Sequence, residues 1–178
     1  MKRSKVATTE KPIRSNMCVF ARLAVATPRV EPKAQPISDE NKNEWLQTRL
    51  GERCLIHISA RDTNGAYSVV EIVSDVRDGT PMHIHQNEDE HFFILEGTAR
   101  IASGAETFAA AAGTSVTLRK GIPHAWCNSS NSPLRMVVIA SPGGSEEILR
   151  LIAKGGDIDI MALSEKFGVR TVGPMPSS

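Results

Sequence analysis

Two histidines and a glutamate have the residue types and spacing of metal ligands. His83 and His85 are separated by one residue, and in an extended strand alternate side chains lie on the same face of a sheet. Glu90 follows a turn at residues 86–89 and is expected on the next strand. Its carboxylate would add the negative charge that neutral imidazoles lack. This spacing predicts three ligands that meet around one ion.

A second segment supplies the fourth expected ligand. Gly121 and Pro123 favour a tight turn that places His124 at the start of a further strand, across a barrel from the other three ligands. Imidazole and carboxylate groups accept several first-row ions. We therefore expect one divalent transition metal (Fe, Mn, Ni, Cu or Zn), whose identity the residues leave open.

Short strand-like runs surround both segments. From about Trp45 onward, runs rich in apolar and β-branched residues alternate with turns and single glycines. Many short strands at near-regular spacing, with no long helix among them, favour an all-β sandwich or barrel. The expected strands are residues 55–58, 67–73, 82–85, 92–95, 99–102, 107–110, 115–118, 125–128 and 134–140.

The last part of the chain has the pattern of two short helices. Ser145 is expected to cap the first, which begins with two glutamates and ends at Gly155. Asp157 is expected to begin the second, which ends before Gly168. Each helix has one apolar face and is too short to be stable alone. We expect both to pack on the barrel exterior or across its end.

Both ligand-bearing segments resemble the two motifs of the cupin superfamily. The first motif, G-x(3–5)-H-x-H-x(3,4)-E-x(6)-G, is met by Gly79, His83, His85, Glu90 and Gly97. The second, G-x(5)-P-x-G-x(2)-H-x(3)-N, is met by Gly113, Gly121, His124 and Asn128. Arg119 stands where the family usually has proline, a departure that concerns the rigidity of the turn rather than ligation.

The resemblance covers about residues 45–142 and implies a cupin fold, a jelly-roll β-barrel also called a double-stranded β-helix. It implies one metal bound by His83, His85, Glu90 and His124. A set of ordinary barrel histidines is the less favoured interpretation, because ligand and turn residues all fall in register. A narrower likeness, at residues 88–97, 163–168 and 173–174, is to single-domain bacterial cupins described as quercetin-dioxygenase-like.

Three imidazoles and one carboxylate leave one to three positions open on a five- or six-coordinate ion, as catalytic sites require. A divalent ion with one ionised glutamate keeps a charge near +1, which favours an anionic oxygen ligand. We expect a metal-dependent oxidoreductase of the dioxygenase type, or an isomerase, acting on a small oxygen-rich anionic molecule. Glu90 is also the candidate catalytic base, a role known in the family. The alternative is a non-catalytic cupin that binds or senses a small molecule, because fold and ligands do not fix function.

Composition divides the chain into a basic extension (residues 1–37), a barrel (38–142) and a helical extension (143–178). Residues 1–37 hold eight Lys and Arg against two Glu, whereas the remainder holds 13 basic and 18 acidic residues. Four prolines and the lack of strand alternation favour a disordered, solvated extension, with Met17 as an alternative start. A secretory signal is less favoured because Arg22 interrupts the weakly apolar stretch. A nucleic-acid arm is less favoured because no nucleic-acid-binding fold follows.

The remaining expectations concern partners and compartment. No apolar run approaches the roughly 20 residues of a membrane helix, and nothing resembles a helix-turn-helix, so neither membrane nor nucleic acid is an expected partner. Three cysteines without C-x-x-C spacing favour a reducing, cytoplasmic setting. Exposed barrel edges favour a homodimer, and so does the resemblance to cupins, which are usually dimeric.

Polar residues near the expected ligands have plainer interpretations. His57 is expected to be a packed, hydrogen-bonded strand residue, and His91 should alternate away from the cavity. Glu88 and Asp89 are expected to face water in the turn. Cys127 should also point away from the ligands, which argues against a nucleophile.

Overall fold

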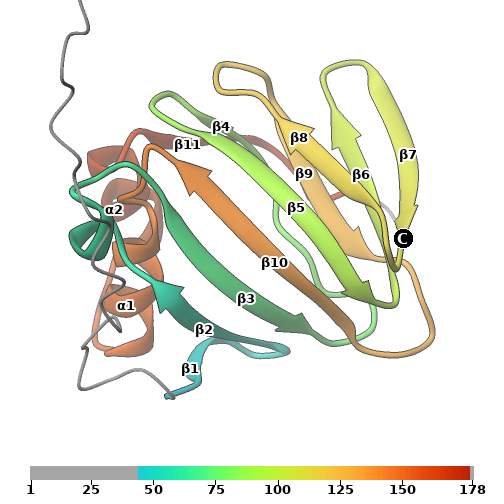
Figure 1. Ribbon diagram of the computed structural model, residues 1–178, viewed down its shortest axis with the longest axis horizontal. Coiled ribbons are helices and arrows are strands. Elements are labelled where there is room, and N and C mark those ends of the chain that lie inside the picture. The colour runs from blue at the N-terminus through green and yellow to red at the C-terminus, as the bar shows by residue number, and fades with distance from the viewer. Residues whose placement is uncertain (1–43, 177–178) are drawn as a thin grey trace, which may run out of the picture. The chain divides into compact units, whose positions relative to one another are not determined.

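The computed structural model describes residues 44–176, which fold into two antiparallel β-sheets with two helices at one end (Figure 1). The expected basic extension, residues 1–37, lies outside the described residues. Within the described residues, no helix combines the length and apolar character needed to cross a membrane.

One sheet has six strands in the order β1-β2-β3-β10-β5-β8. Strand β10 is central, since it pairs in register with β3 on one side and β5 on the other, which places Val138 between Val70 and Phe92. The bounds are β1 Leu46–Arg49, β2 Glu52–Ile58, β3 Ser68–Ser74, β10 Leu134–Ser141, β5 Asp89–Glu96 and β8 Ser115–Leu118.

The other sheet has five strands in the order β11-β4-β9-β6-β7. Strand β4 carries the first two predicted ligands and lies between β11 and β9. The bounds are β11 Val169–Gly173, β4 Met82–His85, β9 His124–Asn128, β6 Thr98–Ser103 and β7 Glu106–Ala111.

The core fills the space between the sheets. Along β10, Leu134, Met136, Val138 and Ala140 are buried while the residues between them are half-buried, the alternation expected of a strand with one face on a core. Isoleucines, Phe92, Leu118 and Trp126 from other strands complete the apolar cluster. The predicted all-β jelly-roll barrel is confirmed, and each of the nine predicted strands is present.

The two predicted helices are also confirmed, as α1 (Glu146–Ala153) and α2 (Ile160–Lys166), but the capping of the first and the start of the second differ from the prediction. Ser145 has helical backbone angles and makes no capping side-chain bond. Buried Glu146 accepts hydrogen bonds instead from the backbone of Gly144 at 2.7 Å and Ala60 at 2.6 Å. The second helix is capped by Asp159, not begun at Asp157, since the Asp159 carboxylate accepts from the backbone of Ala162 at 3.0 Å.

Strands β1 and β11, at the edges of the two sheets, are absent from the sequence-based prediction. After α2 and Gly168, β11 runs back antiparallel to β4, with Val169 beside His85 and Thr171 beside His83. The segment expected as a purely helical extension therefore also contributes a strand to the sheet that holds the histidines. Helix α1 contacts β1, and Leu149 of α1 packs on the core beside Leu46.

Candidate metal centre

The structure brings the four predicted ligands together. One potential ligand atom from each of His83, His85, Glu90 and His124 lies within 4.8 Å of the others. The histidines come from the five-stranded sheet, where His83 pairs directly with His124 across β4 and β9. Glu90 comes from β5 of the opposite sheet. The predicted convergence inside the barrel is therefore present, while metal binding by these residues stays a prediction.

Each imidazole is fixed through its Nδ1 atom. Nδ1 of His83 lies 2.8 Å from the carbonyl oxygen of Pro81, and Nδ1 of His124 lies 2.9 Å from that of Ile122. A carbonyl oxygen can only accept, so both Nδ1 atoms carry the proton and both Nε2 atoms present a lone pair in the neutral ring. This tautomer is the one required for ligation through Nε2.

The third histidine has an anionic partner. Nδ1 of His85 lies 2.7 Å from Oε1 of Glu88, and both side chains are buried. Glu88 was expected to face water, and this expectation is wrong: the side chain is 4% exposed. The sequence signal was present, because a carboxylate three residues after a candidate ligand can turn back on its free ring nitrogen. A carboxylate in this place orients the ring and raises its basicity.

Burial and neighbouring charges shift the pKa values of three of the four groups, and not all in the same direction. Burial lowers the pKa of His83 to about 4, although the Glu90 carboxylate opposes this change. Burial also acts to lower the pKa of His85, but Glu90 and Glu88 together raise it above its ordinary value of 6.5. Burial acts to raise the pKa of Glu90, yet the three histidines outweigh it and bring this pKa down to about 2. The cluster therefore holds an ionised carboxylate.

The donor set fits a divalent cation. Oε2 of Glu90 lies 3.1 Å from Nε2 of His124 and 3.5 Å from Nε2 of His85. In a neutral His124 ring whose proton lies on Nδ1, against the Ile122 carbonyl oxygen, Nε2 has a lone pair and cannot donate to this carboxylate. Lone pairs and a negative charge so close together need a proton or a cation between them. Nε2 of His83, His85 and His124 and the Glu90 carboxylate are therefore the atoms that would hold a divalent cation.

The turn that precedes Glu90 is held by an ion pair. Asp89 accepts from Nη1 of Arg119 at 2.7 Å and from the backbone of Lys120 at 2.9 Å. Asp89 was expected to face water, but its side chain is only 22% exposed. Arg119, which stands in the position of the family's proline, thus joins the two ligand-bearing turns by a side-chain contact.

Other residues singled out in the sequence have structural roles. Asn128 is fully buried and donates to the carbonyl oxygens of Ser74, Asp75 and Ser132, while its own oxygen accepts from the backbone and hydroxyl of Ser130. It ties β9 to two loops and is not a ligand.

The two remaining histidines lie away from the cluster. His57 is hydrogen-bonded as expected, to Glu71 at 2.8 Å, but its side chain is 41% exposed rather than packed. His91 faces away from the cavity, and its Nδ1 contacts the Thr117 hydroxyl at 3.0 Å. Cys127 and Cys54 are buried free thiols, and burial raises the pKa of both. Neither cysteine therefore has the character of a nucleophile.

A cavity of about 240 Å³ opens beside the four ligands. His83, His85 and Glu90 form part of its wall. Apolar side chains from both sheets and from α1 line much of the rest, and they are Val70, Ile72, Phe92, Trp126, Val138, Ile148 and Leu149. Ile160 of α2 and Val169 and Thr171 of β11 also reach the cavity, so the two helices and β11 help to enclose the site.

Comparison with known proteins agrees with this architecture. A family model described as "Cupin domain" matches residues 71–140, the segment that contains all four candidate ligands. The fold also resembles solved structures at low sequence identity. KdgF from Halomonas sp. has a TM-score of 0.54 at 13% identity, covering 61% of this chain and 96% of that one. An RmlC-like cupin from Shewanella frigidimarina has a TM-score of 0.52 at 14% identity, covering 64% and 96%. The matched segment, residues 71–140, is thus a cupin domain.

Sequence similarity also extends to part of two larger enzymes. Mannose-1-phosphate guanylyltransferase 2 of Escherichia coli O157:H7 is 26% identical over 113 residues, which are 62% of this chain and 23% of that protein. Mannose-1-phosphate guanylyltransferase RfbM of Salmonella typhimurium is 31% identical over 75 residues, 41% of this chain and 16% of that protein. The matched segments thus span less than a quarter of either relative.

Proposed function

We propose that this protein is a metal-dependent enzyme, an oxidoreductase of the dioxygenase type, which acts on a small oxygen-rich anionic molecule. The observation that carries the proposal is the cluster of three imidazoles and one carboxylate, each imidazole fixed through Nδ1, of which His83, His85 and Glu90 line a largely apolar cavity. A divalent ion held by these four groups would have open positions directed toward that cavity. An isomerase that uses the same site is the second candidate.

A bound divalent ion would act as a Lewis acid that lowers the cost of ionising an enol, phenol or carboxylic acid. The chain's own residues supply the remaining functions. Apolar walls exclude water, which strengthens the attraction between the site and an anionic oxygen. Glu90 is ionised and lines the cavity, so it can accept a proton from a substrate placed there. We assign Glu90 both the ligand role and the role of catalytic base.

The size of the cavity favours a compact substrate. Pockets for drug-sized ligands commonly measure about 300–1,000 Å³, and the cavity of about 240 Å³ is smaller. Small diketones and hydroxy acids are therefore better candidates than multi-ring compounds. The nucleotidyl transfer named in the two larger relatives belongs to proteins of which this chain matches less than a quarter, and it forms no part of the proposal.

The experiment loads purified protein separately with Fe, Mn, Ni, Cu and Zn and measures metal content, followed by oxygen uptake with small diketones and enolisable acids. Uptake with at least one ion, lost in His83→Ala, supports the dioxygenase proposal. Ion-dependent conversion without oxygen uptake favours the isomerase. Tight ligand binding without turnover with any ion supports the non-catalytic sensor instead. Glu90→Gln, compared with wild type at equal metal content, tests the proton-accepting role.

Assembly and compartment remain proposals. Edge strands β8 and β7 carry exposed backbone edges and exposed or half-buried side chains, which is consistent with a homodimer that covers one of them. Light scattering on the full chain measures the oligomeric state directly. A cytoplasmic setting agrees with the free thiols of Cys54 and Cys127, and it awaits a localisation experiment.

A further inference from the structure

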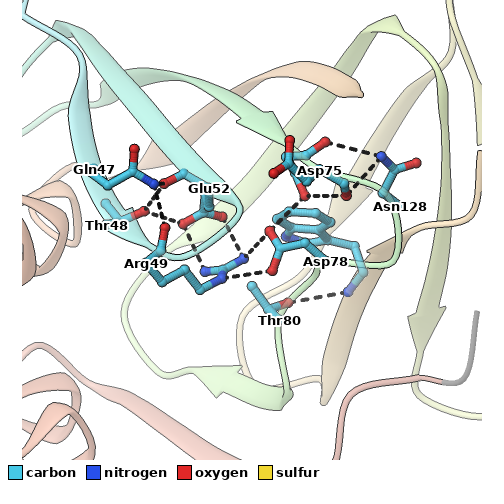
Figure 2. Close-up of polar contacts among 10 residues, drawn as sticks. Gln47, Thr48, Arg49, Glu52, Asp75, Asp78, Thr80 and Asn128 are labelled. Atoms are coloured by element: carbon cyan, nitrogen blue, oxygen red, sulfur yellow. Dashed lines mark hydrogen bonds and ion pairs between the residues drawn. The ribbon is translucent and has the colours of Figure 1, made fainter. Parts of the chain in front are cut away.

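Several polar side chains on the wall of the cavity already have partners within the protein. Figure 2 shows Arg49 and Glu52 of the β1–β2 hairpin in one network with Asp78, in which Arg49 contacts both carboxylates at 2.7–3.1 Å. The Thr80 hydroxyl accepts from the backbone of Trp126 at 3.3 Å. These contacts tie the hairpin and β9 to the loop before β4, so they account for the polar groups at this end of the cavity.

The hydroxyl of Ser68 differs, because it makes no hydrogen bond with any residue from 44 to 176. Ser68 is only 1% exposed, and it lines the cavity. Within the same residues, no side-chain polar atom that is sealed inside the protein lacks a hydrogen-bond partner. The Ser68 oxygen therefore borders open space, and the cavity is the open space that this buried residue lines.

The alternation of β3 gives the same direction for the Ser68 side chain. Ser68, Val70 and Ile72 are buried and line the cavity, whereas Val69 and Val73 on the opposite face are half-buried. Successive side chains of a strand point to opposite faces. Ser68 therefore shares the inner face of the sheet with the apolar core.

Ser68 also lies in one cross-strand row with the candidate ligand Glu90. Ser68 pairs with Ala140 of β10, and Ala140 pairs with Glu90 of β5, on three strands that lie side by side in Figure 1. Residues directly opposite each other in antiparallel strands share a face, and all three line the cavity. Neighbouring strands are about 4.8 Å apart, so the backbones of Ser68 and Glu90 are about 10 Å apart. The side chain between them is a single methyl group, which leaves room for a compact ligand across Ala140.

A buried carboxylate near Ser68 disfavours a second anionic group at this end of the cavity. Glu146 is 2% exposed and lines the cavity, and its Oε2 accepts from the backbone of Gly144. The preceding residue, Gly143, packs on Ser68 so closely that an added Cβ would lie 2.8 Å from the Ser68 nitrogen. The Glu146 carboxylate is thus anchored one residue from the backbone that contacts Ser68. In surroundings of low polarity it would repel a ligand carboxylate placed there.

We propose that Ser68 determines substrate specificity by donating a hydrogen bond to a neutral carbonyl or hydroxyl oxygen at the end of the substrate remote from the metal. This inference rests on the proposed function, which places an anionic oxygen at the metal. The next row of the sheet, Val70, Val138 and Phe92, is apolar and lines the cavity, so it can pack the carbon atoms between the two oxygens. The substrate class is then a compact keto or hydroxy acid, rather than a dicarboxylic acid or a plain fatty acid.

The test uses the full chain loaded with the ion that it retains best, and measures dissociation constants by calorimetry. The probes are straight-chain carboxylic acids of about five to seven carbons, each compared with the ω-hydroxy acid, the (ω−1)-keto acid and the dicarboxylic acid of the same length. At the best length we expect the keto or hydroxy acid to bind about fivefold more tightly than the plain acid, the usual gain from one neutral hydrogen bond. Equal affinity of the plain and oxygenated acids, or preference for the dicarboxylic acid, would overturn the proposal.

Two serine variants locate the effect. Ser68→Ala should reduce the preference for a neutral oxygen to less than about twofold. It should leave metal content, affinity for the plain acid and the free energy of unfolding unchanged, because the hydroxyl has no partner among the described residues. Ser74→Ala is the matched control, since Ser74 is fully buried on the same face of β3 but donates to Asp78 at 2.8 Å and does not line the cavity. This control should lower the free energy of unfolding and keep the preference.

The outcomes separate the role of Ser68 from the function of the site. A preference that persists in Ser68→Ala, or a clear loss of stability in that variant, would overturn the proposal, since the second result would give the hydroxyl a structural partner. Equal binding of all the acids would refute the role of Ser68 alone. Failure of every acid to bind the metal-loaded protein would refute the proposed function as well.

Discussion

Glu88 provides the sharpest test of the candidate metal centre, because its carboxylate contacts one candidate ligand without being a candidate ligand itself. Its carboxylate lies 2.7 Å from Nδ1 of His85, and the equivalent partners of His83 and His124 are backbone carbonyl oxygens that no substitution removes. Glu88→Gln keeps the shape and an accepting oxygen while removing the charge. Replacement of such a ligand-orienting carboxylate costs roughly 10–100-fold in metal affinity. We expect the lower end, about tenfold, because the amide oxygen can still accept from Nδ1.

The pH dependence of the loss in metal affinity distinguishes a role of Glu88 in orienting His85 from a general loss of structure. Protons compete with the metal for Nε2 of His85, and Glu90 and Glu88 raise the pKa of His85 above 6.5 against the opposing effect of burial. Wild-type affinity should therefore fall as the pH drops through this raised pKa. Without the Glu88 charge the pKa of His85 falls, so proton competition begins at a lower pH. The tenfold difference in metal affinity between wild type and Glu88→Gln, expected near pH 8, should become smaller as the pH falls toward about 6.

The assay is competition for Zn²⁺ or Ni²⁺ with a chromophoric chelator, over about pH 6–8. Glu71→Gln is the matched control. Like Glu88, Glu71 is a buried glutamate beside a histidine, at 2.8 Å from Nε2 of His57, but it does not contact a candidate ligand. It should leave metal affinity unchanged at every pH. A Glu88→Gln protein with wild-type affinity at about pH 8, or with a loss that does not change with pH, would refute the assigned role.

Three further predictions concern ligation and the frame of the barrel. His83→Ala and His124→Ala should both lose the stabilisation that added metal gives, which for the wild type reaches about 2.7 kcal/mol at an ion concentration 100 times Kd. The measurement is the shift in melting temperature on adding the ion. A shift that persists in either variant contradicts the ligand assignment. Asn128→Ala should lower the free energy of unfolding by about 3 kcal/mol, measured in urea, because three buried or partly buried hydrogen bonds to backbone carbonyl oxygens are lost. A loss below about 1 kcal/mol would contradict this prediction. Gly79→Ala should lower the free energy of unfolding by at least about 3 kcal/mol, because the added Cβ would overlap the Trp126 carbonyl oxygen and lie 2.6 Å from Cα of Cys127. Gly113→Ala, which has open space around the added Cβ, should lower it by only about 1 kcal/mol.

Local signals were sufficient to predict the strands that hold the ligands. His83 and His85 alternate on one strand, and Gly121 and Pro123 start the strand of His124, so spacing alone indicates which side chains share a face. The edge strands were harder to predict. Strand β1 has four residues and β11 has five, and both become strands only by pairing with β2 and β4. Periodicity within so short a run is weak, and the partner that stabilises it lies elsewhere in the chain.

The polar residues around the site show a different limit of sequence reasoning. Glu88 and Asp89 are adjacent acidic residues in the same turn, and composition gives both the same expectation of facing water. In the structure they separate: Glu88 turns inward to His85, while Asp89 turns to Arg119 and to the backbone of Lys120.

The Asp89 contact also accounts for Arg119 in the position of the family's proline. Proline stiffens a turn through its own ring, whereas Arg119 reaches the preceding ligand turn and attaches to it. Both solutions restrict the same backbone, but only the second depends on a partner 30 residues away in the sequence. A motif comparison therefore shows that proline is missing, and the structure shows which ion pair stands in its place.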